Sequence, residues 1–144
     1  MKKINIYDDY NHIKLMQSRH VNELITKIEN SGGLGNEKEI ELNIEDCVTN
    51  YPSTPMLIDY FLNHLSHFEG EKNLVIKLGG LGNKEIYILF TLVLGGEFFN
   101  IHDKIENDDE IVKWKEIINK KLKEKKIVLR VLYTPDRTEY TYGN

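Results

Sequence analysis

The hydroxyl pair Ser53 and Thr54 is the feature of this chain best suited to regulated chemistry. The pair lies in the turn Tyr51-Pro-Ser-Thr-Pro55, between an alternating segment at 39–45 and an amphipathic segment at 56–68. A phosphate on either hydroxyl adds about −1.5 to −2 charges. The free N–H groups at a helix start would hold such an anion. Ser53 and Thr54 are therefore candidate phosphoacceptors.

A simpler role for Thr54 is structural. Threonine followed by proline is a frequent helix start, with Thr54 as N-cap and Pro55 at the first helical position. In that role, Thr54→Ala would cost about 1 kcal/mol of stability. The residues by themselves favour this capping interpretation.

Other reactive patterns in the chain are incomplete. The turn Gly79-Gly-Leu-Gly82 has Glu85 where a dinucleotide-binding fingerprint needs glycine, and it lacks the Lys-Ser/Thr pair of a phosphate loop. His64 and His67 have a spacing that suits a shared metal, but no second Cys/His pair lies nearby in the sequence. Cys47 is the single cysteine and is expected to be a small filler at a strand end. We predict no catalytic residue, no metal site and no cofactor.

Composition limits the classes of partner. The chain has 144 residues, 40% of them hydrophobic and 29% charged, with a formal net charge of −4. An acidic balance argues against a general nucleic-acid binder, and the longest apolar run, 86–94, is too short to span a bilayer. The lysine-rich run 120–126 is expected to be a solvated last helical turn. We expect a soluble cytoplasmic protein with neither nucleic-acid nor membrane partners.

Hydrophobic periodicity predicts alternating strands and helices. Strands are expected at 3–6, 39–45, 73–78, 98–101, 127–133 and 138–142, and helices at 18–30, 56–68 and from 107, while 83–94 fits either a helix or a strand. This order predicts one α/β domain over 1–144, with a mixed, largely parallel sheet, helices packed against it and a C-terminal β-hairpin.

The patterns also predict which side chains face the core. One-sided alternation at 39–45 is typical of a strand near a sheet edge. In the helix at 56–68, Asp59 and Asn63 are expected on the polar face opposite the apolar stripe. In the last helix, the residues expected to face inward are Ile111, Trp114, Ile117, Ile118 and Leu122.

From about residue 38 to 120 the order of elements resembles a STAS domain, the fold of bacterial anti-sigma-factor antagonists, in its divergent form. The matching segments are 40–46, 52–55, 74–78, 86–94, 98–101 and 111–114. In that family an Asp-Ser-Ser-Gly-like motif opens the amphipathic helix, and the second hydroxyl is the phosphoacceptor. Thr54 takes that position here, or Ser53 if the match shifts by one residue. Pro52 and Pro55 replace the family's aspartate and glycine.

The resemblance implies a non-enzymatic regulatory module that binds another protein. The expected binding surface comprises Pro52, Pro55, Asp59 and Asn63, and the implied partner is a kinase-like ATPase of the anti-sigma type. A second hypothesis rests on the small size, acidic balance and missing catalytic set. Under it, the chain is an immunity- or inhibitor-type protein that neutralises a basic toxin or enzyme by charge complementarity.

Overall fold

A computed structural model describes residues 1–49, 53–79 and 108–144, and for 108–111 it describes the backbone only. Seven strands and four helices lie in these ranges. The strands are β1 (Lys2–Asn5), β2 (Lys14–Leu15), β3 (Glu39–Asn43), β4 (Val48–Thr49), β5 (Lys72–Leu78), β6 (Ile127–Tyr133) and β7 (Thr138–Tyr142). The helices are α1 (Ile6–Tyr10), α2 (Ser18–Asn30), α3 (Ser53–Leu65) and α6 (Asp108–Glu124).

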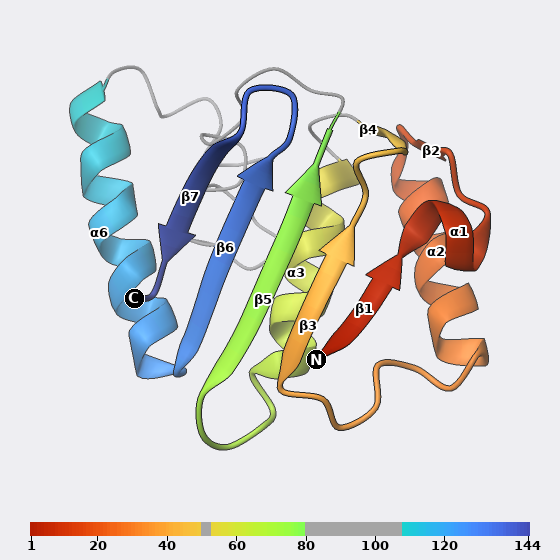
Figure 1. Ribbon diagram of the computed structural model, residues 1–144. Helices are drawn as coiled ribbons and strands as arrows, with labels where there is room; N and C mark the ends of the chain where they lie inside the picture. Colours follow the sequence, from red (N-terminus) through yellow and green to blue (C-terminus); the bar gives the residue numbers. More distant parts are fainter. Residues whose placement is uncertain (50–52, 80–107) are drawn as a thin grey trace.

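The five-stranded sheet has the order β1-β3-β5-β6-β7 (Figure 1). Its first four strands are parallel, and β7 pairs antiparallel with β6 as a hairpin. The protein is therefore a small α/β domain with a mostly parallel mixed sheet, which confirms the predicted fold class and the C-terminal hairpin.

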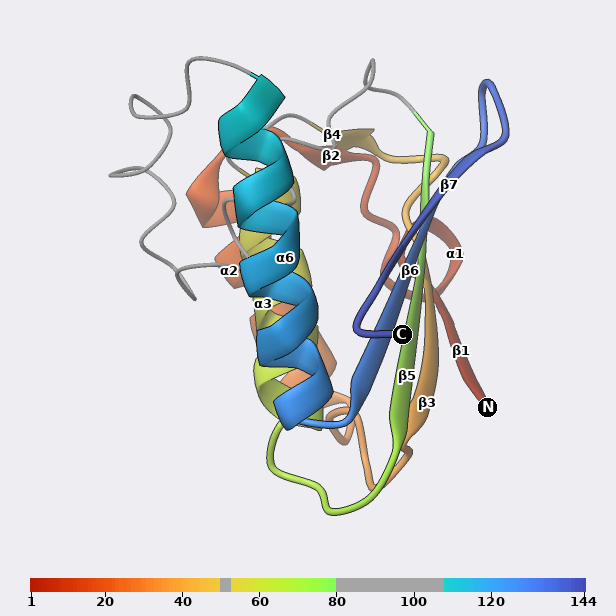
Figure 2. The same ribbon diagram turned by 90° about the vertical axis from the view of Figure 1, so that its left-hand side faces the viewer.

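The three long helices α2, α3 and α6 lie on one face of the sheet (Figure 2). Parallel strands that follow one another across a sheet need crossovers of one hand, which puts their connecting helices on the same side. The opposite face is not covered by any described element, and it carries ion pairs between Lys77 and Glu41 (3.6 Å) and between Arg130 and Glu139 (2.7 Å).

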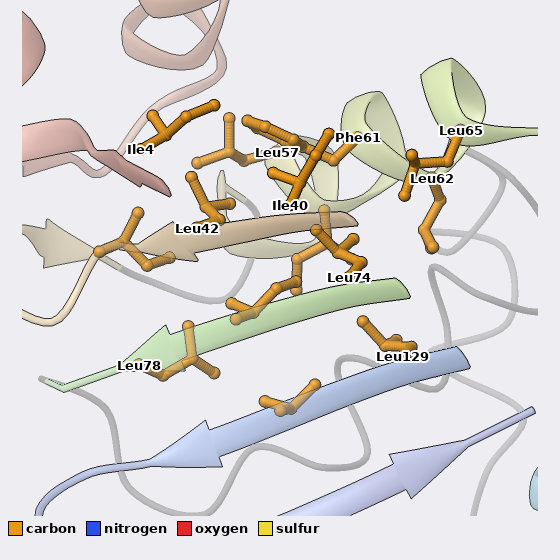
Figure 3. Close-up of a cluster of buried hydrophobic side chains, with 14 of the residues drawn as sticks. Ile4, Ile40, Leu42, Leu57, Phe61, Leu62, Leu65, Leu74, Leu78 and Leu129 are labelled. Atoms are coloured by element: carbon orange, nitrogen blue, oxygen red, sulfur yellow. The ribbon is translucent and has the colours of Figure 1, made fainter. Parts of the chain in front are cut away.

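The core fills the space between sheet and helices (Figure 3). In β5, alternate residues from Lys72 to Leu78 are buried and those between them are half-buried. Side chains of α3 pack against the same face. The labelled core residues are Ile4, Ile40, Leu42, Leu57, Phe61, Leu62, Leu65, Leu74, Leu78 and Leu129. Fully burying each such side chain stabilises the fold by about 1.5–3 kcal/mol.

One expectation about the sheet was wrong. The strand β3 has buried residues on one face only, as predicted, yet it lies between β1 and β5 and not at an edge. The one-sided pattern arises because helices cover only one face of the whole sheet. Alternation along a strand shows whether each of its two faces is covered. It does not show whether other strands pair with it on both sides.

Several element boundaries differ from the predictions. The strand predicted at 3–6 ends at Asn5, and Ile6 already begins α1, where the Asn5 side chain accepts a hydrogen bond from the Asp8 N–H. The helix α2 has the predicted bounds, with Gln17 as its N-cap. In α6, Ile118 and Leu122 are buried as expected, whereas Ile117 is 38% exposed and Trp114 is half-buried.

The short parallel pair of β2 and β4 was not predicted. It joins Lys14 to Val48 and Leu15 to Thr49, near the carboxyl ends of β1 and β3. Two-residue strands are too short to show a period, so only the folded chain reveals them. The predicted segments 83–94 and 98–101, Pro52 and most of the turn at 79–82 lie outside the described residues. Within the described ranges, no helix combines the length and apolar character needed to cross a membrane.

Because helices cover only one face of the sheet, truncating side chains on the two faces of β5 should lower the free energy of unfolding by different amounts. Ile76→Ala empties a fully buried site and should lower the free energy of unfolding by about 2–5 kcal/mol. Val75→Ala, its neighbour on the uncovered face, should cost less than about 1 kcal/mol. Urea denaturation measures both values, and equal losses would contradict a single covered face.

Candidate functional site

The hydroxyl pair lies in the first turn of α3, which begins at Ser53 and not at Met56 as predicted. Thr54 is therefore a first-turn residue and not the N-cap. Pro55 is tolerated at the third helical position because the first N–H groups of a helix have no intrahelical acceptor.

Both hydroxyl residues are buried. Ser53 is 0% exposed and Thr54 is 4% exposed. The Thr54 Oγ1 atom is buried and has no hydrogen-bond partner among the described residues. A buried hydroxyl without a partner costs about 1–3 kcal/mol, so this threonine does not contribute to stability as a cap would.

Burial also decides how a kinase would reach these residues. A kinase must place the acceptor oxygen in its own active site, and neither hydroxyl is accessible in this conformation. A phosphate bearing about two negative charges has no place in a buried apolar setting. Modification of Ser53 or Thr54 therefore requires the first turn of α3 to open.

Asp59 lies on the side of α3 that faces α6. It is half-buried, and burial raises the pKa of its carboxyl, while Lys121 of α6 and Lys125 in the turn after α6 lower it. Its neighbour Tyr60 faces α2, where burial raises the pKa of the phenol and the nearby Glu29 raises it further. Asp59 thus faces α6, and Tyr60 faces α2.

The four residues expected to bind a partner are not brought into one exposed surface. Asn63 is exposed, Asp59 is half-buried beside α6, and Pro55 is buried. Pro52 lies outside the described residues. The sequence pattern correctly indicated the polar side of α3. It did not reveal that the flanking helices α2 and α6 reduce the part of that side that is exposed to solvent.

His64, on α3, and His67, just after it, also differ in their surroundings. The Nε2 atom of His64 lies 3.2 Å from the Gly35 carbonyl, and its ring packs edge-on against Phe68. Burial lowers the pKa of His64. His67 is exposed beyond the end of the helix. Among the described residues, no three His, Cys, Asp or Glu side chains are grouped so as to hold a metal ion.

A contact between Cys47 and His12 was missed by the sequence reasoning. The Cys47 thiol donates a hydrogen bond to the His12 carbonyl at 2.8 Å. Burial raises the pKa of that thiol to about 11, so it is protonated and poorly nucleophilic at neutral pH. The residues are too far apart in the chain for any motif, and the pairing of β2 with β4 brings them together.

The His12 imidazole is also buried, and no described group forms a hydrogen bond with its Nε2 atom. Burial is the main cause that lowers the pKa of His12, and Lys27 lowers it further. The ring is therefore neutral at physiological pH. Together with the Cys47 side chain, the ring packs the loop after α1 against the loop after β3.

Comparison with known proteins gave no match to a family model, to a curated protein sequence or to a solved structure.

Replacing Thr54 tests whether its hydroxyl has a capping role. Thr54→Val keeps the shape and removes a buried hydroxyl that has no partner, so the free energy of unfolding should stay constant or rise by up to about 1 kcal/mol. Chemical denaturation followed by circular dichroism measures the change. A loss near 1 kcal/mol would restore the capping interpretation.

The raised pKa of Asp59 predicts a pH-dependent effect of Asp59→Asn. The folded state holds the carboxyl proton more tightly than the unfolded state, so ionisation above the unfolded value of 3.8 disfavours folding. The variant should therefore be more stable than the native chain at pH 7. Its advantage should shrink as the pH falls towards 3.8 in urea titrations at several pH values. An advantage that grew on acidification would contradict the assignment.

Proposed function

We propose that the protein is a non-enzymatic, STAS-like regulatory module that binds a partner protein through the outer side of α3. Modification of Thr54, or of Ser53, is proposed to switch this binding. The observation that carries the proposal is the buried Thr54 hydroxyl in the first turn of that helix, which has no hydrogen-bond partner within 1–49, 53–79 and 108–144.

The cost of this hydroxyl supports a role beyond folding. Valine has nearly the same shape and would remove the penalty of about 1–3 kcal/mol for an unpaired buried oxygen. Natural proteins accept local destabilisation of this size where function needs it. A hydroxyl that accepts a phosphate supplies such a reason, and the resemblance to anti-sigma-factor antagonists points to the same residue.

The switch would work by opening the start of α3. A phosphate cannot return to the buried site without losing its hydration, so the modified chain keeps its first helical turn displaced. The side chains that follow, from Met56 to Asn63, then change their positions. A partner that recognises the outer side of α3 in one state therefore loses that surface in the other.

The surface itself suits a transient partner. Asn63 and His67 are exposed, and Met56 and Tyr60 are half-buried beside them. This mixture of polar and partly covered apolar groups is typical of small, reversible interfaces. By resemblance, a kinase-like ATPase is the partner we propose.

A quantitative pull-down tests the proposal with four variants of the full chain as bait. Thr54→Asp and Asn63→Lys should each reduce recovery of the ATPase partner at least about fivefold, by opening the first turn and by disrupting the contact surface. The matched controls are Thr54→Val, which keeps the helix start closed, and Asn22→Lys on the exposed side of α2.

Equal recovery by all four baits would eliminate the α3 surface. Loss with Asn63→Lys but not with Thr54→Asp would retain the surface and remove the switch. Phosphate mapping by mass spectrometry, on protein purified from its source cells, then shows whether Ser53 or Thr54 carries the modification.

An inhibitor of a basic toxin or enzyme is the second candidate. It is favoured by the exposed carboxylates Asp8, Asp9 and Asp46, which follow β1 and β3 at one end of the sheet. A complex of that kind depends strongly on ionic strength. Recovery that disappears at raised salt and is insensitive to Asn63→Lys would favour this candidate over the α3 surface.

A further inference from the structure

Each of three adjacent parallel strands has a lysine at its amino end. These amino ends lie at the opposite end of the sheet from the start of α3. Lys38 precedes β3, Lys72 opens β5 and Lys126 precedes β6. Backbone hydrogen bonds hold these positions together, from the Lys72 N–H to the Lys126 carbonyl and from the Asn73 N–H to the Lys38 carbonyl, each at 2.8 Å.

Lys72 is the centre of this group. The residue is only 3% exposed, and its ammonium group donates a hydrogen bond to the Phe68 carbonyl at 2.7 Å. Desolvation lowers its pKa, and repulsion from Lys126, Lys38 and Lys125 lowers it further. Four lysines, Lys38, Lys72, Lys125 and Lys126, therefore lie close together in a protein whose net charge is negative.

The neighbouring lysines belong to different elements. The Lys38 ammonium lies 3.4 Å from where a Cβ atom on Gly70 would stand. Lys123 and Lys125 come from the end of α6 and the turn after it. Among the described side chains, no ion pair within 4.0 Å joins Lys38, Lys72, Lys123, Lys125 or Lys126 to a carboxylate. The sequence pattern predicts that the lysine-rich run 120–126 is a solvated helix end. That prediction does not account for Lys38 and Lys72, which lie outside the run.

Three of these lysines border a hollow of about 430 Å³ at the amino end of β5 and β6. Lys72, Lys123 and Lys126 line it together with Asn73 and Asn144, and Glu71 is the residue in its wall with an acidic side chain. Gly70 and Gly143 leave parts of the wall without side chains. A second hollow of about 500 Å³ adjoins Lys72 and Lys126, but Glu69 and Glu124 line it, which makes it less positive.

We propose that the first hollow binds a small phosphate-bearing anion, such as a pyrophosphate group or a phosphate monoester. Three lysines and Asn73 are among the residues that line it, and their ammonium and amide groups can donate to phosphate oxygens; lysine serves proteins widely as a phosphate ligand. The volume suits a small ligand. This site is separate from the proposed α3 surface and independent of it.

Binding of inorganic pyrophosphate to the full chain tests this site, with potassium chloride at matched ionic strength as reference. Isothermal titration should detect binding to the native chain that chloride does not reproduce. The double variant Lys72→Met with Lys126→Asn should weaken it about tenfold or more, because two charged contacts are lost. Methionine keeps the buried stem, and asparagine suits the positive φ of 57° at Lys126.

Lys113→Met with Lys120→Met is the matched control. Both lysines are exposed on α6 and lie outside the hollow, so the net charge changes equally while affinity should stay within about twofold. Equal weakening in both double variants, or no binding beyond the chloride reference, would overturn the proposal. If the first double variant does not fold, Lys123→Met on the exposed end of α6 provides the same comparison.

A parallel titration with ATP distinguishes the source of the phosphate. Tighter binding of ATP than of pyrophosphate would indicate a nucleotide ligand with further contacts to the base or sugar. Weaker binding of ATP would indicate that the site takes a smaller phosphate-bearing anion.

Discussion

The apolar contact between one face of the parallel sheet and three helices is the interaction on which the other features depend. Alternate residues of β3, β5 and β6 are buried beneath α2, α3 and α6. The other face holds charged side chains that pair with one another. Because the described helices lie on the same side, the residues of both proposals lie at the two ends of the strands and on the outer side of α3.

The two ends of the sheet differ in chemical character. The carboxyl ends lead into the Cys47–His12 contact and into the buried hydroxyls at the start of α3. The amino ends gather lysines from three strands and from the end of α6. The two proposals therefore concern opposite ends of the molecule, and each can fail without affecting the other.

The position of α3 has two consequences. As the middle helix of the layer, it buries most of its apolar side chains, which fixes its place on the sheet. The same position draws Asp59 towards the lysines of α6 and Tyr60 towards α2, so only a narrow outer strip remains exposed. A change at its first turn would be transmitted to that strip because both belong to one rigid helix.

Local pattern was sufficient for the longer strands and helices of the described ranges, the sheet type and the final hairpin, because hydrophobic period and turn residues act over a few neighbours. It also placed Ser53 and Thr54 directly before a helix, although α3 begins three residues earlier than predicted. Only the tertiary structure decided that these hydroxyls are buried, that Asp59 faces α6 and that Ile117 is exposed. It also brought Cys47 to His12 and Lys38 to Lys72 and Lys126. Burial and charge clustering depend on which elements become neighbours, and that information is not contained in any single segment of the chain.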